Sequence, residues 1–302
     1  MEKHDPDFDD EIDLTELINV IWTAKKLIIQ ITAIFAIGSV AFSLSLTNYY
    51  KSETLLHARS GSATQGLSQY SGLAAMAGVS LPSSGEDKAA QTIALIQSRE
   101  FVKHLLTFEN ILPPMMAAKS YNTDSQQLFY DQKLYDSETK TWKITPSYLD
   151  AHKEYIDKML SISQAKLTGF ISIHIEHISP VFAKEFLDLI IRESNEILRK
   201  KDMEESKQGL KYLTSELSKT PFVEIKESIN SLIESQLEKQ MLTQINKDYI
   251  LIQIEPPFVP EKKSKPSRSV ICLLGTILGG ILSVAIVLIR HYHFMEEKQT
   301  AV

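Results

Sequence analysis

Two stretches without a charged residue dominate the hydropathy pattern of this chain. They run from Leu27 to Leu46 and from Val270 to Ile289. About 20 helical residues, each rising ~1.5 Å, cover the roughly 30 Å hydrocarbon core of a bilayer. Lipid offers backbone polar groups no hydrogen-bond partner, so each stretch is predicted to be a membrane-spanning helix. The alternative, a buried core helix, seldom runs this long without a polar face.

The residues before the first stretch argue against a cleaved secretory signal. A signal sequence begins with basic residues and ends at a small-residue cleavage site. Here the preceding segment is acidic, and no clear A-x-A site follows the apolar run. The first stretch is therefore expected to be a retained anchor. The acidic residues are Asp5, Asp7, Asp9, Asp10, Glu11, Asp13 and Glu16.

Two spans place both tails on one side of the membrane and the intervening segment on the other. Lys25 and Lys26 favour a cytoplasmic N-terminal tail, whereas the basic residues before the second span favour the opposite orientation. Charge alone therefore leaves the orientation open. The predicted order is a tail at 1–26, a span at 27–46, a large domain at 47–269, a span at 270–289 and a tail at 290–302.

Periodicity within the large domain predicts an α+β fold. Ile171, Ile173 and Ile175 alternate with polar residues, as in a half-buried strand. Apolar stripes at helical spacing predict two long helices separated by Pro221, which together form a helical hairpin projecting from a mixed α/β base. The predicted strands are 49–58, 167–178 and 249–254; the predicted helices are 86–107, 151–160, 180–217 and one that begins near 223.

Three parts of the domain have less regular patterns. The Ser-, Gly- and Ala-rich segment Ser60 to Gly85 predicts a loop. Its apolar centre, Leu73 to Val79, either docks on a neighbouring subunit or belongs to a flexible surface loop. Pro113 and Pro114 are expected to end a helical unit, and residues 115–150 give only weak signals. The polar run Arg199 to Gly209 predicts a helix exposed to solvent or to other chains.

The segment Glu255 to Ser269 contains Pro256, Pro257, Pro260 and Pro266. Proline favours extended backbone and removes the N–H that a strand ladder needs. The segment is predicted to be a stiff strut that fixes the approach of the domain to the second span. An ordinary proline-rich linker is the alternative.

Small residues recur every four positions in the second span, at Gly275, Gly279 and Ser283. This spacing lets membrane helices approach closely, although glycine is also common in such helices by chance. Ser39 and Ser43 of the first span are a candidate counterpart.

Composition and motifs do not indicate catalysis. The large domain has nearly equal numbers of acidic and basic residues, so it has no bias toward nucleic acid. No phosphate loop, H-E-x-x-H or G-x-S-x-G motif occurs, and neither a metal nor a cofactor is expected. His174 and His177 cannot share a strand face, and solvated histidines are expected there. Carboxylate pairs such as Glu204–Glu205 fit a solvent-exposed helix face. The single cysteine, Cys272, lies in the second span and excludes an intrachain disulfide.

Taken together, these features resemble the chain length determinant (Wzz-type) polysaccharide co-polymerases. The resemblance is concentrated in EIDLTELINVIWTAKK (11–26), YYKSETLL (49–56), SGLAAMAGVSLP followed by IALIQSREFVKHLL, and the proline-rich run before a glycine-containing second span. Residues 110–165 contribute little to it.

The resemblance implies a non-enzymatic protein of the inner membrane, with its large domain in the periplasm. It implies a homo-oligomeric ring that sets the length of O-antigen or a related polysaccharide made by a Wzy-type polymerase from lipid-linked repeat units. Some relatives carry a fused tyrosine kinase. This chain ends 13 residues after the second span, so it resembles the kinase-free, lipopolysaccharide-type branch.

Two other functions are compatible with a two-span protein. A periplasmic sensor, or an adaptor subunit of a signalling or transport complex, would need a partner to supply its cytoplasmic output. A membrane-anchored glycan-cleaving enzyme would need an acid and base pair in a cleft.

Overall fold

The computed structural model describes residues 14–59, 86–219, 221–245 and 248–300. The chain divides into two compact units, one made of Met1–Asn48 and Lys265–Val302 and the other of Tyr49–Ser264. The first contains both predicted spans, and the second contains most of the predicted large domain. The Ser60–Gly85 segment, including Leu73–Val79, lies outside the described residues.

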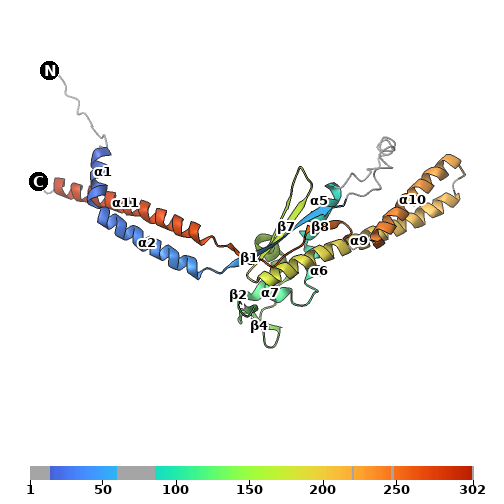
Figure 1. The fold of residues 1–302 in the computed structure, drawn as a ribbon, viewed down its shortest axis with the longest axis horizontal. Coiled ribbons are helices and arrows are strands. Elements are labelled where there is room, and N and C mark those ends of the chain that lie inside the picture. Colours follow the sequence, from blue (N-terminus) through green and yellow to red (C-terminus); the bar gives the residue numbers. More distant parts are fainter. Residues whose placement is uncertain (1–13, 60–85, 220, 246–247, 301–302) are drawn as a thin grey trace, which may run out of the picture. The chain divides into compact units, whose positions relative to one another are not determined.

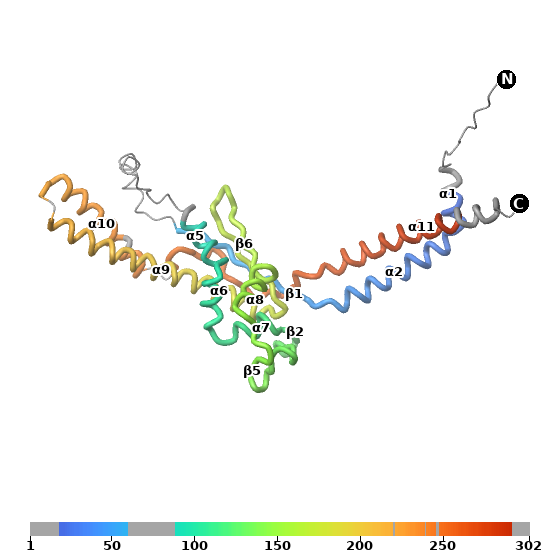
Figure 2. The backbone as a smooth tube through the Cα atoms, turned by 180° about the vertical axis from the view of Figure 1, so that it is seen from behind, coloured from blue at the N-terminus to red at the C-terminus, as the bar shows by residue number. Residues whose placement is uncertain are grey.

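The first unit consists of α1 (Leu14–Thr23), α2 (Lys25–Ser45) and α11 (Arg268–Thr300). Helices α2 and α11 lie side by side, and α1 contacts both (Figures 1 and 2). In the most apolar window of each long helix, only 6% and 17% of residues are buried. A core helix of a soluble protein would be mostly buried, so these two have the length and the apolar surface of membrane-spanning helices.

A five-stranded sheet forms the base of the second unit, in the order β6–β7–β1–β8 with β9 also paired to β1. Strand β1 pairs antiparallel with β7 and β8, and β7 pairs antiparallel with β6. The prediction for β1 is confirmed at both ends of the strand. The strands are β1 (Tyr49–Ala58), β6 (Leu160–Gln164), β7 (Ile171–His177), β8 (Leu251–Glu255) and β9 (Lys263–Lys265).

The core lies between this sheet and α9 (Pro180–Lys219), which contacts both β1 and β7 (Figure 1). Ile171, Ile173 and Ile175 are fully buried, as their alternation predicts. Shorter helices also contribute to the core, which includes Leu56, Phe101, Leu105, Tyr155, Phe186, Leu187 and Ile190. These helices are α5 (Glu86–Ile96), α6 (Arg99–Leu105), α7 (Leu112–Ala117), α8 (Tyr148–Glu154) and the π-helical turn η2 (Tyr155–Met159).

The predicted helical hairpin consists of the second half of α9 and α10 (Val223–Ile245), which lie side by side (Figures 1 and 2). The buried Ser206 donates its hydroxyl to the carbonyl oxygen of Gln236 at 2.8 Å. Gly209 also lies against the Gln236 side chain. The polar run of α9 was expected to face solvent or other chains, but part of it packs on α10.

Local hydrogen bonds explain where other helices differ from the prediction. The predicted helix at 86–107 is interrupted at Ser98, whose Oγ accepts the backbone N–H of Phe101 and caps α6. Pro113 and Pro114 were expected to end a helical unit, but they lie at the start of α7, where a missing N–H costs nothing. The predicted helix at 151–160 begins earlier, at a capping box formed by Ser147 and Asp150, and its end is η2.

Residues 115–150, which gave weak signals, include two small antiparallel pairs. They are β2 (Ala118–Asn122) with β3 (Gln127–Tyr130), and β4 (Tyr135–Asp136) with β5 (Thr141–Trp142). Tyr135 packs against Tyr130 and Trp142 with ring centroids 5.4 and 4.9 Å away. Aromatic contacts therefore hold this short region together.

Candidate functional site

The proline-rich segment is held along β1 by two side-chain hydroxyls. Ser52 donates to the carbonyl oxygen of Phe258 at 2.7 Å, and Thr54 donates to that of Glu255 at 2.6 Å. Both residues are buried, at 0% and 2% exposure. A proline-rich segment has few N–H donors, but its carbonyl groups still require partners. Strand β1 supplies those partners from its side chains.

The four strut prolines occupy different environments. Pro257 and Pro260 are buried, Pro266 is half-buried and Pro256 is exposed. The segment was expected to stay out of a strand ladder, but residues 263–265 form β9 and pair with β1. The hydroxyl of Ser264 also donates to the backbone carbonyl of Tyr49 at 3.2 Å. The segment is therefore held by its pairing with β1 and by side-chain hydrogen bonds to it. The stiffness expected of its prolines stays a prediction.

The small residues of α11 lie where it meets α2. A Cβ atom added at Gly275 would lie 2.4 Å from Cβ of Ser39, and one added at Gly279 would lie 2.5 Å from Cβ of Phe35. Ser283 is buried, with its hydroxyl 3.5 Å from that of Thr32. Within this unit, the three predicted packing residues therefore follow one line of contact with α2.

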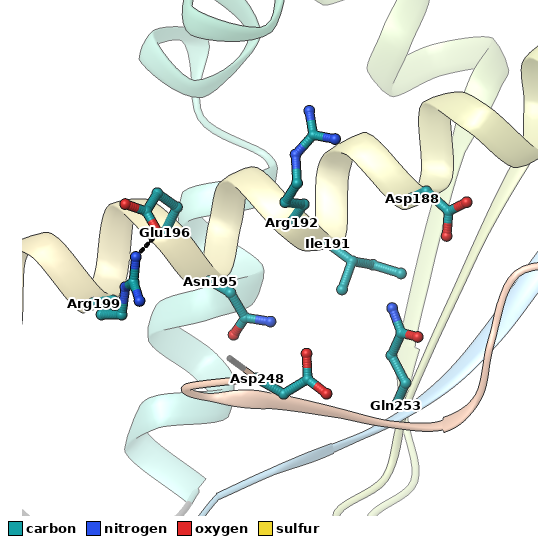
Figure 3. Close-up of a pocket in the computed structure, with 8 residues that line it drawn as sticks. All are labelled: Asp188, Ile191, Arg192, Asn195, Glu196, Arg199, Asp248 and Gln253. Carbon is teal, nitrogen blue, oxygen red and sulfur yellow. Dashed lines mark hydrogen bonds and ion pairs between the residues drawn. The ribbon is translucent and has the colours of Figure 1, made fainter. Parts of the chain in front are cut away.

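A polar groove of about 440 Å³ lies between α9 and the segment leading into β8. Figure 3 shows Asp188, Arg192 and Glu196 on the helix, with Asp248 and Gln253 on the returning chain. Within the groove, Asn195 points from the helix toward the strand (Figure 3). Its Oδ1 accepts the backbone N–H groups of Ile250 at 3.0 Å and Leu251 at 2.8 Å.

The Asn195 amide also donates from Nδ2 to the carbonyl oxygen of Leu251 at 3.1 Å. One side chain thus supplies a donor and an acceptor to the strand backbone, much as a neighbouring strand would. Asn195 is buried, so losing these bonds would leave backbone groups unpaired. Asn195 therefore connects α9 to the segment that follows the helical hairpin.

Two further polar clusters hold elements against α9. His104 Nε2 lies 2.9 Å from Glu193 Oε2, and Arg192 Nε donates to Glu193 Oε1 at 3.0 Å. Burial acts to raise the pKa of Glu193, but its hydrogen bonds to His104 and Arg192 lower that pKa below its usual value. The second cluster is centred on Asp202, which accepts from Lys88 at 3.1 Å and from the Tyr249 hydroxyl at 2.7 Å.

His177 differs from the solvated histidine that the sequence predicts. It is buried on the apolar face of β7. The strand alternates without interruption, so His177, six residues after Ile171, points to the same face as that residue. The backbone N–H of Ser179 donates to Nδ1 at 3.0 Å, so the proton resides on Nε2, which lies 2.9 Å from the Pro114 carbonyl oxygen. Burial lowers the pKa of His177 from 6.5 to about 4. Among the described residues, no group of three or more His, Cys, Asp or Glu side chains could hold a metal ion.

The residues that hold these contacts were largely missed by the sequence analysis. Ser52 and Thr54 could have been recognised, because they alternate with Leu56 on the same face of β1. Polar side chains on a buried strand face need hydrogen-bond partners inside the domain. Asn195 gave no such signal, because its partner lies 56 positions later in the chain. Through their hydrogen bonds, Ser52 and Thr54 position the proline-rich segment and Asn195 positions β8.

The comparisons with known proteins bear on the N-terminal part of the chain. The family model described as "Chain length determinant protein" matches residues 10–107, which include α1, α2, β1, α5 and α6. Residues 10–107 are therefore similar to the chain length determinant (Wzz) family. This match confirms the resemblance that the sequence motifs indicated. This Wzz region includes α2, one of the two helices that are long and apolar enough to cross a membrane.

Relatives of the Wzz region include the tyrosine-protein kinase etk of Escherichia coli (strain K12), which is 37% identical over 91 residues. The proteins of the same name in the O127:H6 and O157:H7 strains match equally. The matched stretch is 30% of this chain and spans only 11% of the length of each kinase. The identity therefore concerns the Wzz region and not the whole relative.

Two solved structures of polysaccharide co-polymerases are among those that match this chain. One, described as a full-length bacterial polysaccharide co-polymerase, has a TM-score of 0.42 at 12% identity, covering 93% of this chain and 98% of that one. A fragment of WzzB, a polysaccharide co-polymerase from Salmonella Typhimurium, has a TM-score of 0.33 at 14% identity and covers 72% of this chain and 100% of its own.

Proposed function

We propose that this protein regulates polysaccharide chain length as a non-enzymatic scaffold in the inner membrane. The observation that carries the proposal is the Wzz region at residues 10–107, which includes the candidate membrane-spanning helix α2 and strand β1 of the sheet. In this proposal, the large domain lies in the periplasm. It acts with a Wzy-type polymerase on lipid-linked repeat units of O-antigen or a related polysaccharide.

The scaffold role is supported by the kind of residue found at the candidate site. The contacts of the proline segment, Asn195 and the glycines of α11 determine where chain segments lie. A protein built this way affects polymer length by presenting a surface of defined shape to the polymerase and its product. The termination of the polysaccharide would then depend on the geometry of the scaffold.

Homo-oligomerisation is the second part of the proposal, and α10 supports it. Several of its apolar side chains remain exposed although the helix packs on α9. They are Ile225 at 48%, Leu232 at 39%, Leu237 at 44%, Met241 at 60% and Ile245 at 72% exposure. Leu237, Met241 and Ile245 are spaced four apart, so they lie one above another on one face of the helix and form an exposed apolar stripe. Exposed apolar surface of this kind is typical of interaction sites. A second copy of the chain is the proposed partner. A head-to-tail contact, in which this surface meets a different surface of the next copy, closes a ring when it is repeated about one axis.

The oligomer can be tested by measuring the mass of the detergent-solubilised protein. A Leu237→Glu, Met241→Glu double substitution should dissociate the assembly, because it places two charges in the apolar stripe. Ser231→Glu, at an exposed position of the same helix outside the stripe, should leave the mass unchanged. An assembly that tolerates the double substitution would contradict the role of α10.

The functional test is deletion of the gene followed by electrophoresis of the surface polysaccharide. Deletion should replace a preferred glycan length with a broad ladder, and the intact gene should restore the preferred length. The polymerase must still be present, so a polymerase-deletion strain serves as the reference for the unpolymerised product. An unchanged ladder in the presence of the polymerase would refute the proposal.

Orientation can be tested by labelling engineered cysteines in a Cys272→Ser background. Leu167 is fully exposed in the large domain, and Lys3 lies in the predicted cytoplasmic tail. A membrane-impermeant maleimide added to cells with a permeabilised outer membrane should label Leu167→Cys but not Lys3→Cys. The reverse pattern would place the large domain in the cytoplasm.

A further inference from the structure

Helix α1 has apolar side chains that its neighbouring helices do not cover. Within its unit, α1 contacts α2 and α11, and its Val20 and Ile21 are half-buried. Ile18 and Trp22, however, are 56% and 66% exposed. Residues four apart lie one above the other on the same helix face, so these two form a continuous apolar surface.

The polar residues of α1 lie on a different side. At ~100° per residue, Asn19 and Thr23 are turned away from the face shared by Ile18 and Trp22. The hydroxyl of Thr23 is bonded within the helix to the carbonyl of Asn19 at 2.8 Å. The described part of α1 is therefore amphipathic, with its polar side chains separated from a bulky apolar pair.

The exposed pair adjoins the basic end of α2. The helix direction changes between α1 and α2 (Figure 1). Ala24 is the residue that joins the two helices. Just after this bend, Lys25 Nζ lies 5.3 Å from the centroid of the Trp22 ring. Lys26 follows, and the apolar surface of α2 begins within a turn, where Ile29 is 65% exposed. The apolar pair of α1 therefore continues the apolar surface of a membrane-spanning helix across a pair of lysines.

This arrangement matches the chemistry of the bilayer interface. Tryptophan is enriched at the level of the lipid headgroups, where its ring is apolar and its N–H remains hydrated. Lysine beside it can extend its ammonium group to the lipid phosphates. A helix with one apolar face and one polar face is stable in the plane of this interface.

We propose that α1 lies in the headgroup layer of the membrane that anchors α2, with Ile18 and Trp22 directed toward the acyl chains and Lys25 toward phospholipid phosphates. The partner is a glycerophospholipid surface. The inference rests on the proposed membrane anchoring of α2, and it adds an interfacial helix that sets the depth of that anchor.

Tryptophan fluorescence can test this because the chain has only two tryptophans, Trp22 and Trp142. Trp142→Phe leaves Trp22 as the sole reporter in the full-length protein. The protein is reconstituted into phosphatidylethanolamine–phosphatidylglycerol vesicles that contain phosphatidylcholine brominated either near the headgroup end or near the methyl end of the acyl chain. We expect bromines near the headgroup to reduce Trp22 emission about twofold, and bromines near the methyl end to reduce it less.

Matched variants identify the residues responsible. Ile18→Ser should weaken the quenching of Trp22, whereas Asn19→Ser, on the polar side, should leave it unchanged. Trp22→Phe reports on Trp142 alone and measures the quenching that does not come from α1. Trp22 emission that neither lipid reduces would overturn the proposal, as would equal or stronger quenching by the deeper bromines.

Anchoring itself is measured separately, by flotation of the same protein with the vesicles in alkaline carbonate. Flotation without quenching of Trp22 overturns the interfacial helix and leaves the anchor intact. Failure to float contradicts the membrane part of the proposed function and, with it, this inference.

Discussion

Asn195 of α9 and Leu251 of β8 are joined by a pair of hydrogen bonds, one in each direction. The Leu251 N–H donates to Asn195 Oδ1 at 2.8 Å, and Asn195 Nδ2 donates to the Leu251 carbonyl at 3.1 Å. Leu251 is the first residue of β8, the strand that follows the helical hairpin. The pair therefore defines where the returning chain re-enters the sheet.

Replacement of Asn195 by alanine should destabilise the large domain. The N–H groups of Ile250 and Leu251 would both lose their acceptor in a buried setting. Each unpaired buried group costs about 1–3 kcal/mol, so Asn195→Ala should lower the free energy of unfolding by roughly 2–4 kcal/mol. Denaturant unfolding of the detergent-solubilised protein, followed by circular dichroism, measures the change.

Asn230→Ala is the control for this substitution, because Asn230 is an exposed residue on α10. It should change the free energy of unfolding by no more than about 0.5 kcal/mol. Equal stability of the two variants would show that the Asn195 bridge does not hold β8.

The parts of the fold that follow from local pattern were predictable. The uncharged spans and the alternation of β1 and β7 each depend on the side chains of one short stretch. Pro221 similarly separates α9 from α10 in the sequence itself. Strands β2 to β5 are short and largely exposed, so their residues carry little hydrophobic period. Helix α1 was not predicted either, because it is short and follows a run of acidic residues.

Candidate-site contacts were less predictable, because most of them join distant positions. Thr54 and Glu255 are 201 residues apart, and Asn195 gives no local sign of its strand partner. His177 shows a different limit. The sequence shows that His177 lies on the same strand face as Ile171. Its burial could not be predicted, because the two backbone groups that bond to the imidazole inside the domain are not evident from the sequence. Long-range hydrogen bonds therefore account for most of what the sequence left undetermined.

Acidification should destabilise the large domain through His177. Its folded-state pKa of about 4 lies below the ordinary value of 6.5, so the unfolded chain binds the proton more readily between these pH values. Protonation of Nδ1 would also remove the acceptor for the Ser179 N–H. The stabilisation is complete above pH 6.5 and is lost as pH falls toward 4. It amounts to about 3 kcal/mol, because each pH unit that separates the folded and unfolded pKa values is worth ~1.4 kcal/mol.

Unfolding measured across this pH range with His177→Asn separates this effect from the titration of carboxylates. The variant should show a shallower fall in stability between pH 6.5 and 4 than the unsubstituted protein. His174→Gln, on the same strand but half-exposed, should keep the original slope. A slope that is the same for all three proteins would rule out His177 as its source.

The prolines of the strut should differ in importance according to their burial. Pro260→Ala removes a buried ring that restricts the unfolded chain and packs in the folded one. We expect a loss of roughly 1–2 kcal/mol for Pro260→Ala, and a smaller loss for Pro256→Ala at an exposed position. Thermal unfolding of the two variants gives the comparison. A larger effect at Pro256 would mean that burial against the domain is not what makes the strut rigid.

The hydroxyls of β1 should contribute to the free energy of unfolding as much as the prolines do. Thr54→Val keeps the shape of the side chain but leaves the Glu255 carbonyl without its donor. This change should cost about 1–3 kcal/mol in unfolding free energy. Thr139→Val, at an exposed position, is the matched substitution and should be nearly neutral. If Thr54→Val were also neutral, water or a backbone shift would have to satisfy that carbonyl, and the strut would not depend on β1.

Close packing of the two membrane helices should depend on Gly275 and not on Gly280. A side chain at Gly275 would meet Cβ and Oγ of Ser39, whereas nothing lies within 4 Å of a Cβ added at Gly280. Gly275→Leu should therefore force α2 and α11 apart at a cost of about 1–3 kcal/mol, while Gly280→Leu should leave their contact unchanged.

A disulfide between cysteines introduced at Thr32 and Ser283, whose hydroxyls are 3.5 Å apart, reports this contact in a Cys272→Ser background. It should form efficiently with Gly280→Leu and poorly with Gly275→Leu. Equal yields would show that the glycine does not set the separation of the helices. If that separation is part of length control, the glycan ladder should broaden only with Gly275→Leu, because only that substitution moves the two helices apart.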